Sequence, residues 1–318
     1  MVKLRFSCFC LMFFLLTSSV LVEGDYAYDY DDAFAPGDSE APSPEPSLAP
    51  APAPAPSSGG RGQSTRALVP ALFAFGDSLI DNGNNNKLFS FAKANYFPYG
   101  IDLGGPTGRF SNGYTIIDQI ADLLGLPLLP PHSESSNVNK MRYGVNYASA
   151  AAGILDITGF HFKFYNLGAR KVIIAGIGQM GCIPSMLAES SSGQCSDLVN
   201  EMVHPFNAKL KTMVMKLNKA LPGAHFIYLD MENMFMDIIS NHKSYGFNVI
   251  DRGCCGIGRH RGEVTCLPMQ TPCPNRDEYL FWDAYHPTSA VNLLLGSMAF
   301  YGGSNFTYPM NIEQLAGL

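Results

Sequence analysis

Four short apolar runs constrain the fold of this chain most, because each has the length of one buried strand and each is followed by Gly, Ser or Asn. They span residues 68–75, 143–148, 171–177 and 225–230. Segments between them, such as 114–124 and 199–217, carry apolar residues at helical spacing. Strands that alternate with helices predict a parallel sheet with helices on both faces, which is an α/β sandwich.

The N-terminal part of the chain is expected to lie outside this fold. Residues 1–24 are typical of a secretory signal peptide, because Lys3 and Arg5 precede a short apolar stretch. A membrane anchor is the alternative, but acidic rather than basic residues follow the stretch. Residues 25–66 are acidic and then rich in Pro, Ala and Ser, which predicts a disordered spacer. One folded domain is therefore expected over 67–318, with no later transmembrane segment.

Cysteine usage points to the secretory pathway. Six of the eight cysteines follow the predicted signal, and an even number in a secreted chain predicts disulfides. The short separation of Cys182 and Cys195 allows a local bridge, while the pairing of the other four stays open. A zinc site is the alternative, but the adjacent Cys254 and Cys255 lack the usual ligand spacing. A glycosylation sequon at Asn305 fits the same compartment.

Two short motifs carry the candidate chemistry. The first apolar run ends at Gly-Asp-Ser, which places Ser78 at the carboxyl end of a strand, where parallel sheets bind ligands. Further on, FWDAYHPT holds Asp283 and His286 three residues apart, before a helix that Thr288 or Ser289 can cap. A serine nucleophile needs a base, and the base needs an orienting carboxylate. Each motif alone is more often turn or surface chemistry, but together they predict a Ser-His-Asp triad.

These motifs belong to a longer pattern. The segments FAFGDSLIDNGNNN, GRFSNGYTIIDQIADLLGLPLLPP, YGVNYASAAAGIL, LGARKVIIAGIGQMGCIP and FWDAYHPT resemble the plant GDSL-motif esterase/lipases of the SGNH hydrolase superfamily. The resemblance implies a flavodoxin-like three-layer α/β/α sandwich, with Ser78 as nucleophile, His286 as general base and Asp283 as the residue that orients the histidine. It also implies a secreted serine esterase or lipase that acts through an acyl-enzyme. A metal-dependent hydrolase is a third alternative, but the sequence shows no cluster of His, Asp and Glu ligands to support it, so no metal or other cofactor is expected.

The expected partner of this site is an acyl ester of a small molecule, a lipid or a cell-wall polymer. A formal net charge of −6 and the lack of a basic stripe argue against nucleic acid as a partner. The chain is expected to be an extracellular monomer. Its Ala-Pro repeat at 49–56 resembles segments that carry glycans in plant cell walls.

The sequence departs from the family pattern at the oxyanion site. The resemblance implies three donors, namely the amide of Ser78, an amide of the segment NYASAAAGIL and the side chain of an Asn in a Gly-x-Asn-Asp block. Ala151 and Gly153 are the candidates for the second donor. The third donor is absent, because no Gly-x-Asn-Asp occurs in this chain.

The absent block predicts a shortened chain. From residue 155 the sequence reaches the next predicted strand in about 16 residues, where relatives place helices, a strand and the Gly-x-Asn-Asp turn. Loss of one oxyanion donor costs about 10²–10³ in rate. Loss of a central strand removes burial comparable to the whole stability of a domain, about 5–15 kcal/mol. We therefore expect a sheet that lacks one central strand, with the junction at 158–162. The alternative function is a catalytically weak or inactive secreted glycoprotein of the same family.

Overall fold

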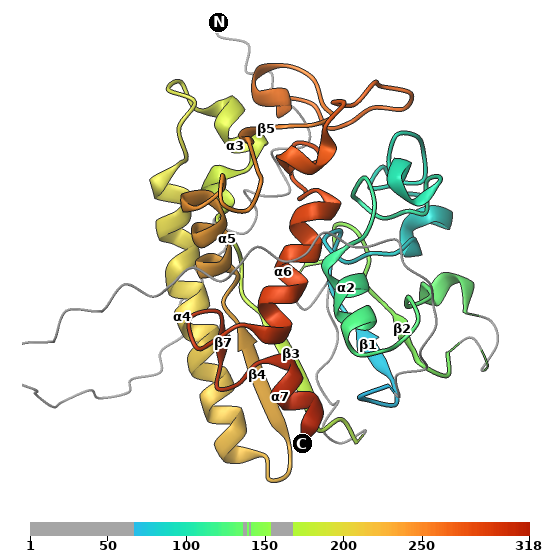
Figure 1. Cartoon of the computed structure of the whole chain (residues 1–318), viewed down its shortest axis with the longest axis vertical. Coiled ribbons are helices and arrows are strands. Elements are labelled where there is room, and N and C mark those ends of the chain that lie inside the picture. Colours follow the sequence, from blue (N-terminus) through green and yellow to red (C-terminus); the bar gives the residue numbers. More distant parts are fainter. Residues whose placement is uncertain (1–66, 136–138, 140, 154–167) are drawn as a thin grey trace, which may run out of the picture. The chain divides into compact units, whose positions relative to one another are not determined.

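The computed structural model describes residues 67–135, 139, 141–153 and 168–318, and the fold given below is that of these residues (Figure 1). The predicted signal peptide, the predicted spacer and the predicted junction lie outside the described residues.

The described residues form seven strands. Their bounds are β1 (Leu72–Ala74), β2 (Gly144–Asn146), β3 (Lys171–Ala175), β4 (His225–Leu229), β5 (Val249–Gly253), β6 (Tyr279–Phe281) and β7 (Thr307–Tyr308). Each of the first four strands lies inside one of the four predicted apolar runs, so these predictions are confirmed. The last three strands are not predicted by the apolar pattern, because β5 contains charged residues and the other two are very short.

Parallel pairing dominates the strands. β1 pairs with β2, β3 with β4 and β5 with β6, all in parallel, and β7 is added to β4 in the antiparallel direction. The pairs form three sheets, of which β3-β4-β7 is the widest. Within the described residues no ladder of hydrogen bonds joins β1 to β3. The chain therefore has an α/β fold with parallel strands, as the alternation of strands and helices predicts.

Helices follow most of the strands. Their bounds are α2 (Ile116–Leu123), α3 (Pro184–Glu189), α4 (Asp197–Ala220), α5 (Met231–Ser240), α6 (Ser289–Tyr301) and α7 (Ile312–Gly317). α2 and α4 confirm the two helical segments predicted from apolar spacing, and α6 confirms the helix after FWDAYHPT. In Figure 1 α4 runs along β4, and the two elements are in contact. Among the described helices, none has both the length and the apolar character needed to cross a membrane.

The strands differ in how deeply their side chains are buried. β4 has a partner on each side, and Ile227 at its centre is fully buried. β1 has one described partner, and Phe73 at its centre is 54% exposed. β3 also has one described partner, and none of its side chains is fully buried. The prediction of buried strands is therefore confirmed for β2, in which all three residues are buried, and for β4. It is wrong for β3 and for most of β1.

The largest core cluster joins α2 and α6, which pack closely against each other. Ile120 and Ala121 of α2 and Leu295 of α6 belong to this cluster. At the crossing point Gly296 has no room for a side chain, because a Cβ there would lie 2.6 Å from a side-chain carbon of Gln119. This crossing fixes the start of α6, and with it the loop that holds His286.

Candidate active site

Ser78 lies in the turn that follows β1 and is half-buried. Two backbone hydrogen bonds continue the pairing of β1 and β2 beyond their ends. The amide of Tyr147 donates to the carbonyl of Ala74 (2.7 Å), and the amide of Ser149 donates to the carbonyl of Gly76 (3.0 Å). The turn with Ser78 is thus held against the segment after β2, at the carboxyl ends of both strands. This is the edge at which parallel sheets bind ligands.

The structure brings Ser78, His286 and Asp283 into one chain of hydrogen bonds. The Oγ of Ser78 lies 2.8 Å from Nε2 of His286. On the other side of the ring, Nδ1 lies 2.9 Å from Oδ1 and 3.0 Å from Oδ2 of Asp283. One ring nitrogen therefore faces a hydroxyl and the other a carboxylate. In this arrangement the ring can take the hydroxyl proton while the carboxylate fixes the ring's tautomer and orientation.

The loop between β6 and α6 fixes the positions of Asp283 and His286. Oδ1 of Asp283 accepts hydrogen bonds from the amides of Tyr285 and His286, each at 2.8 Å, so the carboxylate closes its own turn. The amide of Trp282 donates to the carbonyl of His286 (2.7 Å). Thr288 then caps α6 through its side chain, which decides between the two predicted caps.

Burial and hydrogen bonding act on Asp283 in opposite directions. The side chain is fully buried, and burial alone would raise the pKa of its carboxyl group. The charge of His286, together with hydrogen bonds from His286, Tyr99 and the amide of Tyr285, outweighs burial and holds the pKa of Asp283 below its ordinary value. The carboxylate is therefore ionised at neutral pH.

Asp81 links the turn that carries Ser78 to the segment after β2. Its Oδ1 accepts hydrogen bonds from the amides of Gly83 (2.8 Å) and Asn84 (2.7 Å), and its Oδ2 accepts one from the amide of Ala150 (2.9 Å). Burial raises the pKa of Asp81, and the amide hydrogen bonds offset part of this effect. One carboxylate thus holds two backbone segments of the site together.

Asn85 makes a second link of the same kind and is buried. Its side-chain nitrogen donates to the carbonyls of Ala92 (3.0 Å) and Ala150 (2.9 Å), and its oxygen accepts the hydroxyl proton of Ser149 (2.7 Å). An Asn side chain suits this position because it offers both donors and an acceptor. The asparagine-rich segment, residues 82–86, therefore builds the scaffold of the site.

The second oxyanion donor stays a prediction. The amides of Ala150 and Ala152 already donate to other groups. For the amides of Ser78, Ala151 and Gly153, no acceptor is found among the described residues. Ala151 has φ of 67°, in the left-handed region that favours glycine, so the backbone there adopts a conformation that an alanine rarely takes.

Tyr99 and Phe110 contact Asp283 and His286, and the sequence motifs assign a role to neither residue. The hydroxyl of Tyr99 donates to Oδ2 of Asp283 at 2.6 Å, across a sequence separation of 184 residues. The ring of Phe110 lies 5.0 Å from the ring of His286, measured between centroids. Sequence reasoning misses both roles because neither residue stands in the serine motif or the histidine motif, although Phe110 lies in the quoted segment that begins GRFSNG.

A buried ion pair lies behind the asparagine-rich segment and is also not predicted. Arg109 donates to both oxygens of Asp118, from Nε at 2.8 Å and from Nη2 at 2.9 Å. The side chain of Asn82 donates to the same carboxylate (3.4 Å). Thr115 is the N-cap of α2, and its amide and its hydroxyl both donate to Oδ2 of Asp118. The pair therefore ties the start of α2 to the scaffold of the site.

The described residues contain three disulfides. Cys182–Cys195 confirms the predicted local bridge, and the pairs that the sequence leaves open are Cys254–Cys273 and Cys255–Cys266. In the part of the chain that the structure describes, no group of three or more His, Cys, Asp or Glu side chains is placed to hold a metal ion.

Comparison with known proteins gives one consistent result. The family model described as GDSL-like lipase/acylhydrolase matches residues 72–165 and 161–297. The chain is 47% identical to GDSL esterase/lipase At1g71691 of Arabidopsis thaliana over 333 residues, covering 79% of this chain and 86% of the relative. It is 38% identical to GDSL esterase/lipase At1g71250 (79% and 90% covered) and 39% identical to GDSL esterase/lipase At1g33811 (80% and 92% covered), both of the same plant.

The same comparisons locate a break in the match. The family model matches in two pieces that overlap over residues 161–165, outside the described residues. The 79% of this chain aligned with At1g71691 corresponds to about 251 of its 318 residues, whereas the alignment runs over 333 residues. At about 82 positions of the alignment, that relative therefore has a residue and this chain has none.

Proposed function

The chain belongs to the GDSL-like lipase/acylhydrolase family, and we propose that it hydrolyses carboxylic esters by means of Ser78, His286 and Asp283. The curated relatives named above are GDSL esterase/lipases, which supports a carboxylic ester hydrolase as the class of enzyme. The observation that carries the proposal is the chain of hydrogen bonds from the Oγ of Ser78 through the imidazole to the buried carboxylate, at 2.8 and 2.9 Å.

In the proposed reaction His286 acts first as a base. Its Nε2 takes the proton of the Ser78 hydroxyl while Oγ attacks the ester carbonyl, and Asp283 stabilises the charged ring that results. When the tetrahedral intermediate collapses, Nε2 gives the proton to the departing alcohol and an acyl-enzyme remains. Water then attacks the acyl group with the same base, the acid leaves, and Ser78 regains its proton.

The oxyanion of each tetrahedral intermediate needs donors that are already in place. We assign this role to the amide of Ser78 and to the amide of Ala151 or Gly153, which have no other acceptor among the described residues. The Asn donor of the family block is absent from this chain. Loss of one such donor is expected to lower kcat by about 10²–10³ and to leave a slow enzyme.

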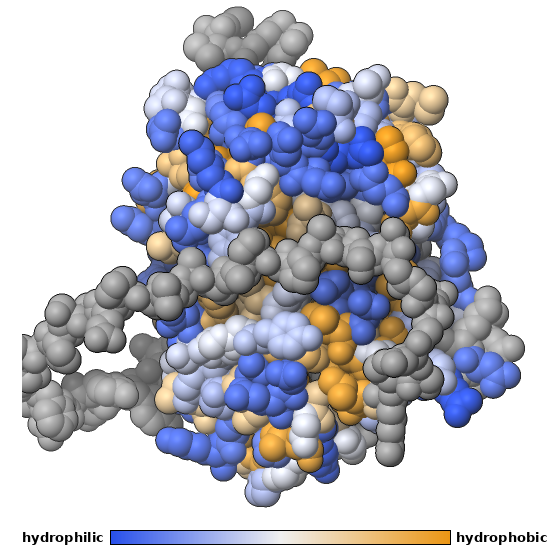
Figure 2. All heavy atoms as spheres, viewed as in Figure 1, coloured by the Kyte–Doolittle hydropathy of each residue, from blue (hydrophilic) through white to orange (hydrophobic). Residues whose placement is uncertain are grey.

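A shortened three-layer sandwich is the fold proposed for this chain. The open edges of β1 and β3 support it, since the missing family segment would supply a strand between them and no described strand pairs with either edge there. The break in the family match at 161–165 supports it independently. Figure 2 shows apolar surface in the lower half of the view, where Figure 1 shows β1, β3 and α7. Such a surface is what an absent strand would leave uncovered.

Restoring the segment tests the shortened fold. A version with the Gly-x-Asn-Asp region of a relative inserted after residue 157 is expected to unfold at a higher temperature and to turn over p-nitrophenyl butyrate at least about 10²-fold faster. Thermal unfolding and steady-state turnover of both forms decide the matter. Equal stability and equal turnover would show that the sheet is complete without the segment.

The proposed domain organisation is a signal peptide at 1–24, a spacer at 25–66 and the hydrolase domain at 67–318. The disulfides and the exposed position of Asn305 are compatible with an extracellular, glycosylated monomer. Its proposed substrates are acyl esters of small molecules, lipids or cell-wall polymers. Expression in a secreting cell is expected to yield a chain that starts near residue 25 and that loses one glycan on Asn305→Gln. A cytosolic product with reduced cysteines would contradict this organisation.

Covalent labelling tests the nucleophile. A fluorophosphonate probe is expected to label the folded protein, and Ser78→Ala is expected to abolish both labelling and turnover of p-nitrophenyl butyrate. Ser192→Ala, which changes an exposed serine on a loop, serves as the matched control and is expected to keep both. Labelling that survives Ser78→Ala would refute the assignment of the nucleophile.

A further inference from the structure

Two side chains among the described residues donate to the Asp283 carboxylate, namely His286 through Nδ1 and Tyr99 through its hydroxyl. The bond from Tyr99 to Oδ2 is 2.6 Å long, and Nδ1 of His286 lies 3.0 Å from the same oxygen. Oδ1 is held by the amides of the turn, from Tyr285 and His286, at 2.8 Å each. The turn thus fixes one carboxylate oxygen, and Tyr99 fixes the other.

Tyr99 has little freedom to move its hydroxyl away. The residue is 1% exposed and packs edge-on against three aromatic rings. The centroid distances are 5.3 Å to Tyr96, 6.0 Å to Phe110 and 5.9 Å to Trp282. A ring enclosed in this way keeps its hydroxyl in one place unless the core opens.

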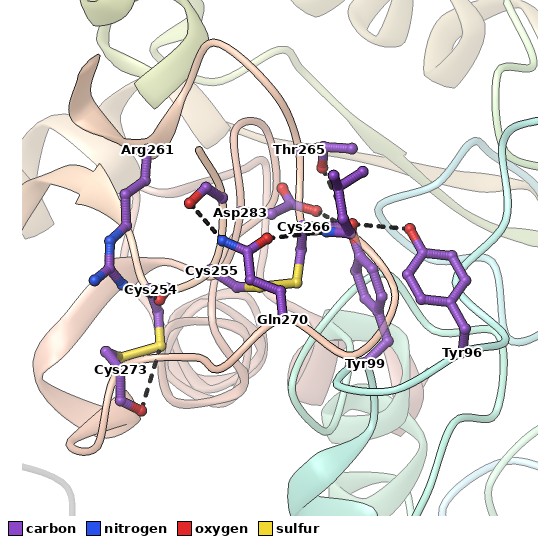
Figure 3. The surroundings of a disulfide bond; sticks show 12 residues. Tyr96, Tyr99, Cys254, Cys255, Arg261, Thr265, Cys266, Gln270, Cys273 and Asp283 are labelled. Carbon is purple, nitrogen blue, oxygen red and sulfur yellow. Dashed lines mark hydrogen bonds between the residues drawn. A yellow bond between two sulfur atoms is a disulfide. The ribbon is translucent and has the colours of Figure 1, made fainter. Parts of the chain in front are cut away.

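The Tyr99 hydroxyl has a second hydrogen-bond partner, Thr265, and the ionised carboxylate decides which group donates in each bond. Oγ1 of Thr265 lies 3.3 Å from the Tyr99 hydroxyl, and the same hydroxyl is hydrogen-bonded to Asp283. An ionised carboxylate can only accept, so Tyr99 gives its single proton to Asp283 and Thr265 donates to Tyr99. Figure 3 shows Thr265 beside the disulfide Cys255–Cys266, which anchors the segment that carries Thr265 next to the tyrosine.

The tyrosine remains a donor wherever the site works. Burial and the charge of Asp283 raise the pKa of Tyr99 well above its ordinary value. The hydroxyl therefore keeps its proton throughout the pH range in which a histidine base changes its charge.

We infer that Tyr99 is a positioning residue for ester hydrolysis, because its hydroxyl holds the Asp283 carboxylate against Nδ1 of His286 and draws off part of its negative charge. The inference rests on the proposed triad, since Tyr99 acts through Asp283 and His286 and touches no substrate atom. Without the hydroxyl, Oδ2 loses its shortest hydrogen bond. The carboxylate then gains freedom to rotate, and the charge that faces the imidazole ring increases.

Tyr99→Phe tests the inference because it keeps the ring and removes the hydroxyl. We expect kcat for p-nitrophenyl butyrate to fall about tenfold with KM changed less than twofold, which is the size expected for one hydrogen bond to a charged group. We also expect the acid limb of the pH profile of kcat/KM to move to higher pH, since a more negative carboxylate makes the ring easier to protonate.

Tyr245→Phe is the matched control. Its hydroxyl also donates to a carboxylate, Asp237, at 2.5 Å, but this pair lies in α5 and the turn after it. The control removes the same kind of bond and is expected to leave kcat and the pH profile unchanged. A Tyr99→Phe enzyme with the kinetics of this control would overturn the inference, whatever its thermal stability.

A second variant covers the case in which Tyr99→Phe fails to fold. Incorporation of 3-fluorotyrosine at position 99 keeps the ring and the hydroxyl but makes the hydroxyl a stronger donor. The acid limb is then expected to move to lower pH, opposite to the effect of Tyr99→Phe. An acid limb that stays in place in this variant also contradicts the inference.

Ser78→Ala separates this inference from the proposed function. Full turnover in Ser78→Ala would refute the proposed triad. Loss of turnover in Ser78→Ala, together with normal kinetics and an unchanged pH profile in the Tyr99 variants, would refute only the role of Tyr99.

Discussion

Asp118→Asn is expected to destabilise the protein strongly, because every hydrogen-bonding position of this buried carboxylate is taken by a donor. Oδ2 accepts from Nε of Arg109 and from the amide and hydroxyl of Thr115, while Oδ1 accepts from Nη2 of Arg109 and from Asn82. An asparagine places an NH₂ group against at least two donors in either orientation. It also leaves the guanidinium without a countercharge, and Arg109 is 7% exposed.

The magnitude follows from breaking a buried pair by removing one partner, which costs about 3–5 kcal/mol. For a domain of this size, 1 kcal/mol corresponds to about 2–4 °C in Tm, so we expect Tm to fall by about 6–20 °C. The measurement is thermal unfolding followed by circular dichroism, at equal protein concentration and pH 7. Asp122→Asn, an exposed carboxylate on the same helix, is the control and is expected to change stability by less than about 0.5 kcal/mol.

A double-mutant cycle separates the ion pair from its surroundings. Arg109→Met leaves Asp118 with the donors of Thr115 and Asn82, so its cost is expected to be smaller than that of Asp118→Asn. The double variant is expected to lose at least about 1 kcal/mol less free energy of unfolding than the sum of the two single variants, because it leaves neither buried charge without its partner. Additive losses, or an Asp118→Asn variant as stable as Asp122→Asn, would refute the reasoning.

Three further predictions concern backbone, charge and crosslinks. Ala151→Gly is expected to raise stability by about 0.5–1 kcal/mol, because relief of the left-handed conformation exceeds the entropy cost of glycine; a lower Tm would contradict this. Burial would raise the pKa of Asp102, but the hydrogen bonds and charge of Arg276 lower it, so this carboxylate stabilises the fold above about pH 4 and loses that effect as pH falls through its lower folded value. Arg276→Met should therefore flatten the decline of Tm between pH 5 and 3, and an unchanged slope would count against it. Replacement of Cys255 and Cys266 by alanine is expected to cost about 3 kcal/mol in urea unfolding, and a loss below about 1 kcal/mol would show that the bridge constrains little.

Much of the fold is predictable because it depends on local patterns. The four apolar runs contain β1 to β4, and helical spacing identifies α2 and α4, since both signals are periodic within a few residues. The strands β5, β6 and β7 escape because β5 contains charged residues and the other two are too short to show an apolar run. The exposure of Phe73 escapes for a related reason, since burial of a strand depends on neighbours that its own sequence does not specify.

The candidate site divides in the same way. Ser78, Asp283 and His286 stand in two compact motifs, so the sequence can nominate them together. Tyr99 cannot be nominated, because its contact with Asp283 spans 184 residues and depends on how two loops meet in space. The choice between Thr288 and Ser289 as the cap of α6 is likewise settled by backbone geometry, which two hydroxyl residues in a row do not distinguish.

The wide separation of the two halves of the site has a consequence for the chain during its synthesis. Ser78 and His286 are 208 residues apart. At about 5–20 residues per second, a ribosome needs about 10–40 s to produce the histidine after the serine. Throughout that interval the nascent polypeptide carries a serine with no base beside it and cannot form an acyl-enzyme by the proposed route. Ester-cleaving capacity is thus acquired in one late step, when the segment from β6 to α6 docks onto parts that were made first.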